Sequence, residues 1–147
     1  LKTHARDYCV SFVDNVVIDD INILNATYKA MHTALDGLNR VSVSRILVDG
    51  SNFKTYFSNK EDCFIIPHYC VTGGDNVYLS IAAASILAKV SRDSYMEQLC
   101  VANPEYTERY DWTNNKGYGT SNHIKGINAY GITDLHRKTF GICKVYA

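Results

Sequence analysis

The sequence has no excess of charge of either sign and no long hydrophobic run. Its 147 residues include 15 Lys and Arg against 15 Asp and Glu, so the formal net charge at pH 7 is zero. A neutral chain exerts no long-range pull on a polyanion, and nucleic-acid binding would need a local basic surface. No segment approaches the roughly 20 apolar residues of a membrane span, and no signal-peptide pattern opens the chain. We expect a soluble protein of the cytoplasm, or of the nucleus in a eukaryote, with no membrane partner.

Cysteine pairs at short spacing are also missing. The five cysteines are odd in number and none forms a C-x-x-C pair, which argues against a disulfide framework and a zinc ribbon. Cys63, His68 and Cys70 are close in sequence, but residues 63 and 70 of one strand point to opposite faces and a fourth ligand is lacking. The cysteines therefore indicate a reducing compartment and no structural metal.

Hydrophobic residues make up 46% of the chain, enough for one globular core. Their spacing predicts a single α/β domain without repeats or linkers. We expect strands over residues 7–18, 45–50 and 63–71, helices over 19–38, 80–100 and 121–131, and a loop over 105–120.

Two of these elements have features that bear on function. Pro67 favours an edge position for the strand over residues 63–71. The helix over residues 80–100 carries a run of Ala and Ser that suits close packing on a sheet, with Lys89, Arg92 and Glu97 toward its exposed side.

Two aspartates lie where strands or turns end. Asp49 ends the apolar run ILVD, and Asp75 follows Gly73-Gly74 just before a helix. Carboxylates on such loops can meet and bind a hard cation such as Mg²⁺ through oxygen. A turn preference of Asp beside Gly explains the same pattern without a metal. The Gly73-Gly74 pair could instead cradle a phosphate, although a longer glycine motif is absent.

A second candidate site surrounds Tyr118. Gly117 and Gly119 flank this tyrosine and let the backbone approach a ligand, while Lys116 adds a positive charge suited to a sugar-phosphate chain. Packing of the ring on its own loop is the alternative. From Lys116 onward Asp134 is the single acidic residue. The basic residues there, densest at His136-Arg137-Lys138, form either a binding face or an ordinary solvated surface.

The order of the motifs resembles that of the type 2 ribonuclease H family, ribonuclease HII. The segments that carry the resemblance are IDDINILNATYKAMHTAL, ILVDG, GGD with SIAAASILAKVSRDSYMEQL, KGYGTSNHIKGINAYG and LHRKTF. They run from about residue 8 to residue 140, nearly the whole chain. AASILAKVSRD and KGYGT are each distinctive.

The resemblance implies an α/β ribonuclease H-like fold and an endonuclease that uses Mg²⁺ or Mn²⁺. Such an enzyme cuts RNA in RNA–DNA hybrids, and single ribonucleotides embedded in duplex DNA, by two-metal phosphodiester hydrolysis. Asp49 and Asp75 match the third and fourth of four acidic catalytic and metal-binding residues. Tyr118 matches a tyrosine that stacks on the sugar at the RNA–DNA junction. The implied substrate-binding residues are Lys89, Arg92, Lys116, Gly117, Tyr118, His136 and Arg137.

One part of the family pattern is absent. No Asp-Glu-Ala-Gly-Arg-Gly segment occurs, so two of the four carboxylates and, with them, the central first strand and the second strand of the fold are missing. Because the chain starts at Leu1, we expect residues 1–147 to be the C-terminal portion of a single catalytic domain. That portion would be inactive alone, and the full-length protein a monomer. The alternative is a degenerate, non-catalytic module that binds nucleic acid or a protein partner.

Overall fold

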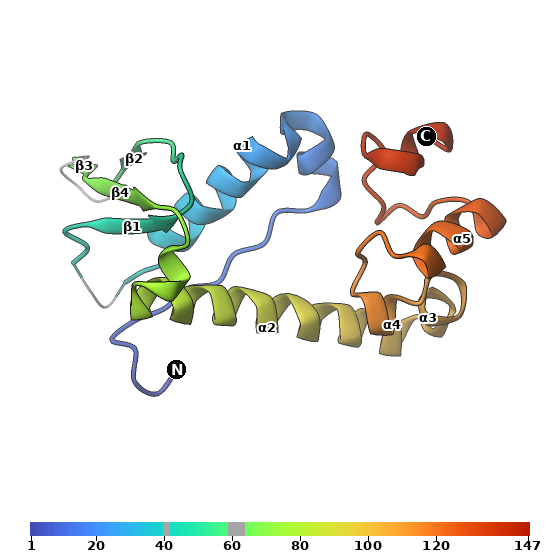
Figure 1. Cartoon of the computed structure of the whole chain (residues 1–147), viewed down its shortest axis with the longest axis horizontal. Coiled ribbons are helices and arrows are strands. Elements are labelled where there is room, and N and C mark those ends of the chain that lie inside the picture. The colour runs from blue at the N-terminus through green and yellow to red at the C-terminus, as the bar shows by residue number, and fades with distance from the viewer. Residues whose placement is uncertain (40–41, 59–63) are drawn as a thin grey trace. The chain divides into compact units, whose positions relative to one another are not determined.

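The computed structural model describes residues 1–39, 42–58 and 64–147, and the chain forms two compact units (Figure 1). Unit 1 consists of Leu1–Val13 and Leu24–Lys89, and unit 2 consists of Asp14–Ile23 and Val90–Ala147. Two helices, α1 (Asn15–Asp36) and α2 (Leu79–Ala102), contribute residues to both units. The assignment of all residues to a single catalytic domain stays a prediction.

Unit 1 contains the strands. β1 (Ile46–Asp49) pairs in parallel with β4 (His68–Val71), and β2 (Tyr56–Phe57) pairs antiparallel with β3 (Ile65–Ile66). The predicted strand over residues 45–50 is thereby confirmed.

The segment predicted as one strand over residues 63–71 is divided at Pro67 into β3 and β4, and Cys63 lies outside the described residues. Proline has no backbone N–H to donate to a neighbouring strand. The Pro67 carbonyl nevertheless accepts a hydrogen bond from the Ile46 N–H at 2.9 Å. Parallel strands and helices agree with the α/β class implied by the resemblance.

The core of unit 1 forms on one side of these strands. Ile46 and Val48 are buried, whereas Asp49 at the end of the same strand is exposed. Tyr56 and Ile66, which are partners across β2 and β3, complete the buried cluster. The alternation of the β1 side chains therefore directs Ile46 and Val48 inward and leaves Asp49 at the carboxyl end of the strand, accessible to solvent.

The start of the chain differs from its prediction. Residues 7–14 are not a strand, and α1 already begins at Asn15, earlier than the predicted helix start. The segment contacts α1 instead of a strand: Cys9 lies against Gly37, and the Ser11 hydroxyl donates to the Ala30 carbonyl. High β propensity forms a strand only where another strand completes its hydrogen bonds.

Asn22 interrupts α1. Its backbone angles, φ 67° and ψ 165°, are not helical, so α1 is two helical pieces joined at this residue. The break lies next to the boundary between Ile23, which belongs to unit 2, and Leu24, which belongs to unit 1. The helix predicted over residues 19–38 is therefore confirmed, but it is interrupted at Asn22 and not continuous.

Helix α2 agrees with its prediction within two residues at either end. Its Ala-rich face does not fit the predicted close contact with a sheet, because Ala84 and Ser85 are exposed. Lys89 and Glu97 are exposed as expected, whereas Arg92 is half-buried.

Unit 2 is helical, and it overturns the prediction of a loop over residues 105–120. That stretch contains α3 (Pro104–Tyr110) and α4 (Trp112–Asn115), separated by Asp111 in the left-handed region at φ 57°. Pro104 occupies the first turn of α3, where its missing N–H has no partner to lose. The predicted helix over 121–131 is confirmed as α5 (Ser121–Tyr130), and Gly131 ends it at φ 77°.

The core of unit 2 is aromatic and sulfur-rich. Tyr110 and Trp112, at the junction of α3 and α4, are 1% and 3% exposed. Gly126 allows α5 to approach α3 closely, since a Cβ at this position would lie 2.0 Å from the Arg109 carbonyl oxygen. The remaining members of the buried cluster are Met96, Cys100, Ile127 and Cys143.

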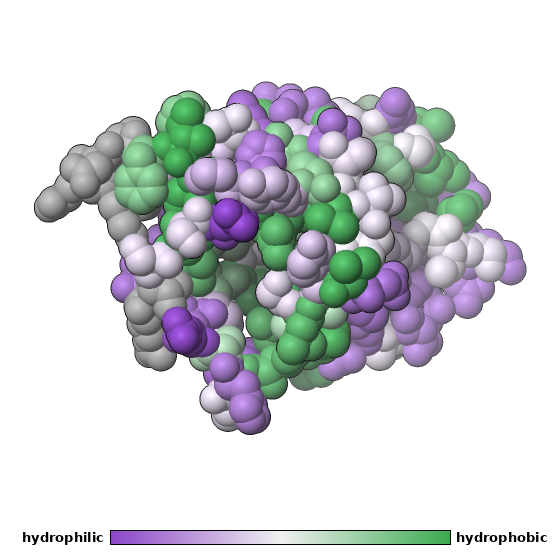
Figure 2. All heavy atoms as spheres, turned by 60° about the vertical axis from the view of Figure 1, so that its left-hand side comes forward, coloured by the Kyte–Doolittle hydropathy of each residue, from purple (hydrophilic) through white to green (hydrophobic). Residues whose placement is uncertain are grey.

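The surface mixes polar and apolar side chains. Figure 2 shows hydrophobic atoms reaching the surface between hydrophilic ones on the face drawn there. Exposed large apolar residues include Phe57, Ile65 and Tyr69 of the strands. Within the described parts of the chain, no helix combines the length and the apolar character needed to cross a membrane.

Candidate functional site

In unit 1, one backbone hydrogen bond links Asp49 to the turn that carries Asp75. Asp49 stands at the carboxyl end of β1, and its Oδ1 accepts the Gly74 N–H at 2.9 Å. Gly74 is buried, and there is no room for a side chain at this position, since a Cβ there would lie 2.6 Å from the Cδ1 atom of Ile81. Asp75 is the next residue and is exposed in the 3₁₀ turn Gly74–Asn76. The structure thus places Asp49 against the residue that precedes Asp75, and the joint binding of a metal by the two carboxylates stays a prediction.

The donor chemistry of this turn fits a hard divalent cation. Carboxylate oxygens are the ligands that Mg²⁺ and Mn²⁺ prefer, and Mg²⁺ is commonly held by one or two carboxylates with water completing its shell. Each aspartate uses one oxygen inside the protein, Asp49 toward Gly74 and Asp75 toward the Asn76 amide at 3.1 Å, and each has a second oxygen. Among the described residues no group of three or more His, Cys, Asp or Glu is gathered around a possible metal position.

Three backbone N–H groups in the turn that follows Gly73 are not available to a phosphate. The Gly74 N–H is donated to Asp49, and the N–H groups of Asn76 and Val77 are donated to the Gly73 and Gly74 carbonyls. These donors already have partners within the protein. Gly73 instead provides the left-handed conformation, φ 67°, that starts the turn.

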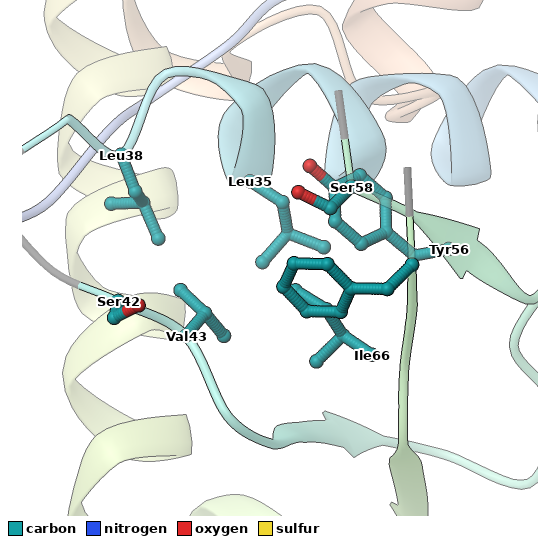
Figure 3. A pocket seen from close by; sticks show the side chains of 8 residues that line it. Leu35, Leu38, Ser42, Val43, Tyr56, Ser58 and Ile66 are labelled. Carbon is teal, nitrogen blue, oxygen red and sulfur yellow. The ribbon is translucent and has the colours of Figure 1, made fainter. Parts of the chain in front are cut away.

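A small cavity in unit 1 is too narrow for a ligand. Figure 3 shows Leu35, Val43 and Ile66 directed toward one another around it, and its volume is about 20 Å³. Such a volume accommodates a single water molecule. The cavity therefore belongs to the packing of the core.

Residues 116–120, here called the tyrosine loop, are held at several points in unit 2. The buried Asn115 amide donates to the Tyr110 carbonyl at 2.7 Å and accepts the Gly117 N–H at 2.8 Å. The Tyr118 carbonyl accepts the Thr120 N–H at 2.8 Å. Gly117 adopts φ 79°, a conformation that residues with a Cβ rarely take. The loop therefore has a defined backbone, although the Tyr118 side chain is 61% exposed.

The tyrosine loop contains one cation predicted to contact phosphate, Lys116, and a second, Arg92, lies beside it. The Arg92 guanidinium stands 5.1 Å from the centre of the Tyr118 ring and donates to the Lys116 carbonyl at 2.6 Å. The Lys116 ammonium contacts Glu97 at 2.8 Å and the Thr113 carbonyl at 2.6 Å. Part of the Lys116 charge is thus balanced by Glu97. Lys89 is exposed on α2 and belongs to unit 1.

His136 does not fit its predicted role as a surface phosphate contact. It is 5% exposed, and both ring nitrogens contact protein atoms, Nδ1 the Thr133 N–H and Nε2 the His123 ring. Burial, and next the charge of His123, lower its pKa to about 4. A neutral, enclosed imidazole offers no positive charge to a phosphate. The neighbouring Arg137 is half-buried, with its guanidinium 4.0 Å from the centre of the Phe140 ring.

The segment that carries Arg137 is held by the first half of α1. The Asp19 carboxylate accepts the N–H groups of Lys138 and Thr139, and the Asn15 amide donates to the His136 carbonyl at 3.0 Å. Partial burial acts to raise the pKa of Asp19, but the hydrogen bonds from Thr139 and Lys138 outweigh it and hold that pKa below its usual value. Asp19 is therefore a structural clamp on the Arg137 segment.

A single family model covers both the turn that carries Asp75 and the tyrosine loop. The family model described as Ribonuclease HII matches residues 2–143, which is almost the entire chain. The chain belongs to the ribonuclease HII family. This membership confirms the resemblance carried by the ILVDG, GGD and KGYGT motifs.

Several curated relatives are also called Ribonuclease HII. That of Cytophaga hutchinsonii is 47% identical over 136 residues, covering 92% of this chain and 62% of the relative. That of Christiangramia forsetii is 45% identical over 140 residues, covering 95% and 65%. That of Ehrlichia canis is 42% identical over 149 residues, covering 99% and 65%. The chain thus spans less than two thirds of the length of these ribonuclease HII relatives.

Sequence reasoning missed two residues that contact or support the tyrosine loop. His123 is buried on α5 and contacts the Tyr118 carbonyl, and Trp112 donates its indole N–H to His123 at 3.0 Å. The sequence does draw attention to both residues, because His123 follows the helix cap Thr120 by three residues and Trp112 is the single tryptophan of the chain. Neither spacing indicates burial by itself.

Proposed function

We propose that this chain carries part of the catalytic domain of a type 2 ribonuclease H. The substrate would be the RNA strand of an RNA–DNA hybrid or a ribonucleotide embedded in duplex DNA. The observation that carries the proposal is the hydrogen bond from the Gly74 N–H to Asp49, which ties the end of β1 to the residue that precedes Asp75. Family membership supports the reaction class.

Asp49 and Asp75 would hold Mg²⁺ or Mn²⁺ in a two-metal arrangement. A bound divalent cation would supply activation of water and stabilisation of the charge on the leaving oxygen. The roles of the protein are to fix the Asp49 carboxylate against Gly74 and to keep Asp75 accessible on the turn. Tyr118 would stack on the sugar at the RNA–DNA junction, where the 2′-hydroxyl distinguishes RNA from DNA.

The phosphate contacts proposed here are fewer than the sequence suggested. Arg92, Lys116, Gly117 and Arg137 remain candidates in unit 2, and Lys89 in unit 1. His136 is left out, because its ring nitrogens are occupied within the protein. Asp49 and Asp75 supply two of the four carboxylates that the family uses. We therefore expect this chain alone to be inactive.

A nicking assay tests the proposal. We expect no Mg²⁺- or Mn²⁺-dependent cleavage of a duplex with one ribonucleotide by the 147-residue chain, and cleavage once an Asp-Glu-Ala-Gly-Arg-Gly segment of the family is joined upstream. In the joined protein Asp49→Asn keeps the acceptor for Gly74 but loses the charge. Its activity should fall by more than about a hundredfold, the upper range for residues that only support a metal ligand.

Each result of the assay has a defined meaning. Efficient cleavage by the 147-residue chain alone would overturn the account of two missing carboxylates. Binding without any cleavage, even by the joined protein, would instead support a non-catalytic module. An active joined protein that tolerates Asp49→Asn would remove Asp49 from the proposed metal site.

A further inference from the structure

His123 and His136 form a buried pair that the proposed function does not use. Their Nε2 atoms lie 3.1 Å apart, and the two side chains are 6% and 5% exposed. The aromatic rings of Tyr110 and Trp112 surround the pair, with centroids 5.0 and 5.1 Å from that of His136. Two imidazoles so close in an apolar setting are stable only if their protons are arranged without conflict.

The contacts of the outer nitrogens determine where the protons are. The Nδ1 atom of His123 lies 3.0 Å from the Tyr118 carbonyl oxygen, and a carbonyl only accepts, so this nitrogen carries a proton. The Nδ1 atom of His136 lies 2.9 Å from both the backbone nitrogen and the hydroxyl oxygen of Thr133. The hydroxyl can donate or accept, but the backbone N–H only donates, and this contact indicates that Nδ1 of His136 carries no proton.

The inner nitrogens then follow by elimination. A neutral His136 must carry its proton on Nε2 and donate it to Nε2 of His123. That nitrogen of His123 is unprotonated and also accepts the Trp112 indole N–H at 3.0 Å. Burial lowers the pKa of both histidines, in keeping with two neutral rings. The hydrogen bonds therefore favour one proton arrangement, directed from His136 through His123 to Tyr118, in which the lone pair of His123 Nε2 is shared by two donors.

We propose that His123 and His136 are positioning residues that fix the tyrosine loop through this proton arrangement. His123 donates to the main chain of the very residue whose ring is exposed for the ligand. His136 and Trp112 hold the acceptor side of His123 and so keep the donor turned toward Tyr118. This inference rests on the proposed function only in its last step, the contact of Tyr118 with nucleic acid.

The first experiment needs neither a variant nor a nucleic acid. Long-range proton–nitrogen NMR spectra of the ¹⁵N-labelled chain report which imidazole nitrogen carries the proton. At pH 7 we expect the Nδ1–H form for His123 and the Nε2–H form for His136. The opposite forms, or an average of exchanging forms for either ring, would overturn the proposal.

The second experiment separates positioning from folding. In His123→Asn the side-chain amide still reaches the Tyr118 carbonyl as a donor, whereas His123→Leu has no donor at a similar size. We expect the Thr120 amide, which bonds to the same carbonyl, to exchange with solvent several-fold faster in His123→Leu than in His123→Asn. Equal exchange in the two variants would contradict the proposal. His136→Gln, which still has a donor for His123, should resemble the original chain more than His136→Leu does.

The third experiment links the loop to its ligand through a double-mutant cycle. The probe is a fluorescent duplex with one ribonucleotide, and affinity is measured for His123→Leu, Tyr118→Ala and the double variant. Loss of a stacking aromatic should weaken binding about tenfold. We expect His123→Leu to weaken binding several-fold when Tyr118 is present and less than twofold when it is Ala.

The double-mutant cycle tests the contact of Tyr118 with nucleic acid, whereas the NMR spectra test the protons of the histidine pair, so one can fail without the other. Equal losses in both backgrounds would mean that His123 supports the fold and not the tyrosine. If the original chain does not bind the duplex, the proposed function fails for this chain. The tautomers and the Thr120 exchange then still decide whether the pair fixes the loop.

Discussion

We call Asp49 and the 3₁₀ turn that carries Asp75 the carboxylate turn. This turn, in unit 1, and the tyrosine loop, in unit 2, differ in how firmly the protein holds them. Asp49 and Asp75 are exposed, and one backbone hydrogen bond from Gly74 connects the first to the turn that bears the second. The tyrosine loop is held by the buried Asn115, by Arg92 and by the buried histidine pair. The chain thus completes the loop with its own contacts, whereas the carboxylate turn offers oxygens that a cation would have to organise.

The largest effect is expected from breaking the close packing of α5 on α3 in unit 2. In Gly126→Ala the new methyl group would lie 2.0 Å from the Arg109 carbonyl oxygen, so α5 must move away from α3. Overpacking against backbone should destabilise unit 2 by about 3 kcal/mol. Urea unfolding followed by Trp112 fluorescence measures this loss. Gly119→Ala is the control, because nothing lies within 4 Å of its added methyl group; equal stability of the two variants would refute the account.

An intermediate effect is expected from acid. The pKa of His136 is about 4 in the folded chain, below the ordinary value of 6.5, so the unfolded chain binds more protons between these two values. The stability that depends on a neutral His136 is therefore fully present above pH 6.5 and is lost as the pH falls toward 4. The difference between the pKa of His136 in the unfolded and the folded chain corresponds to roughly 3 kcal/mol of unfolding free energy at most. About half of this free energy should be lost by pH 5.

Urea unfolding at pH 7.5 and pH 5 measures this loss. His136→Gln should reduce the pH dependence, whereas His4→Gln, at an exposed position, should leave it unchanged. A slope that His136→Gln does not alter would assign the effect to other groups and weaken the account of a neutral histidine pair.

The smallest effect is expected at the carboxylate turn. Asp49→Ala leaves the Gly74 N–H without its acceptor, which should cost about 1 kcal/mol because the carboxylate is exposed. Hydrogen exchange at the Gly74 amide should then speed up several-fold. Asp49→Asn keeps an acceptor oxygen and should exchange more slowly than Asp49→Ala. If both variants match the original chain, the hydrogen bond does not hold the turn.

The carboxylate turn could be anticipated from the sequence, but the histidine pair could not. Asp49 ends a short apolar run and Asp75 follows two glycines, and local rules for strand ends and turns place such residues correctly. The position of His136 depends instead on Tyr110, Trp112 and His123, which are distant in sequence. Its basic neighbours Arg137 and Lys138 suggested a solvated run, and only tertiary packing shows that one member is buried.

The fold shows the same division between local and distant causes. Helix α5 and strand β1 were predicted because their caps and apolar runs are local signals. The loop predicted over residues 105–120 is instead α3 and α4, and Pro104 begins α3 because proline suits the first turn of a helix. Residues 7–14 have the composition of a strand but lie against α1, a contact that propensity alone does not reveal.

The conformation of Asn22 has a consequence for how α1 unfolds. A φ of 67° with a ψ of 165° belongs to a region that glycine alone visits easily, and such a residue costs about 1–3 kcal/mol. Helical cooperativity passes along an unbroken ladder of hydrogen bonds, and this residue interrupts the ladder. Fraying that starts at Asn15 should therefore stop at Asn22, leaving the turns that follow it intact. Asn22→Gly would remove the strain of the junction without joining the two cooperative segments.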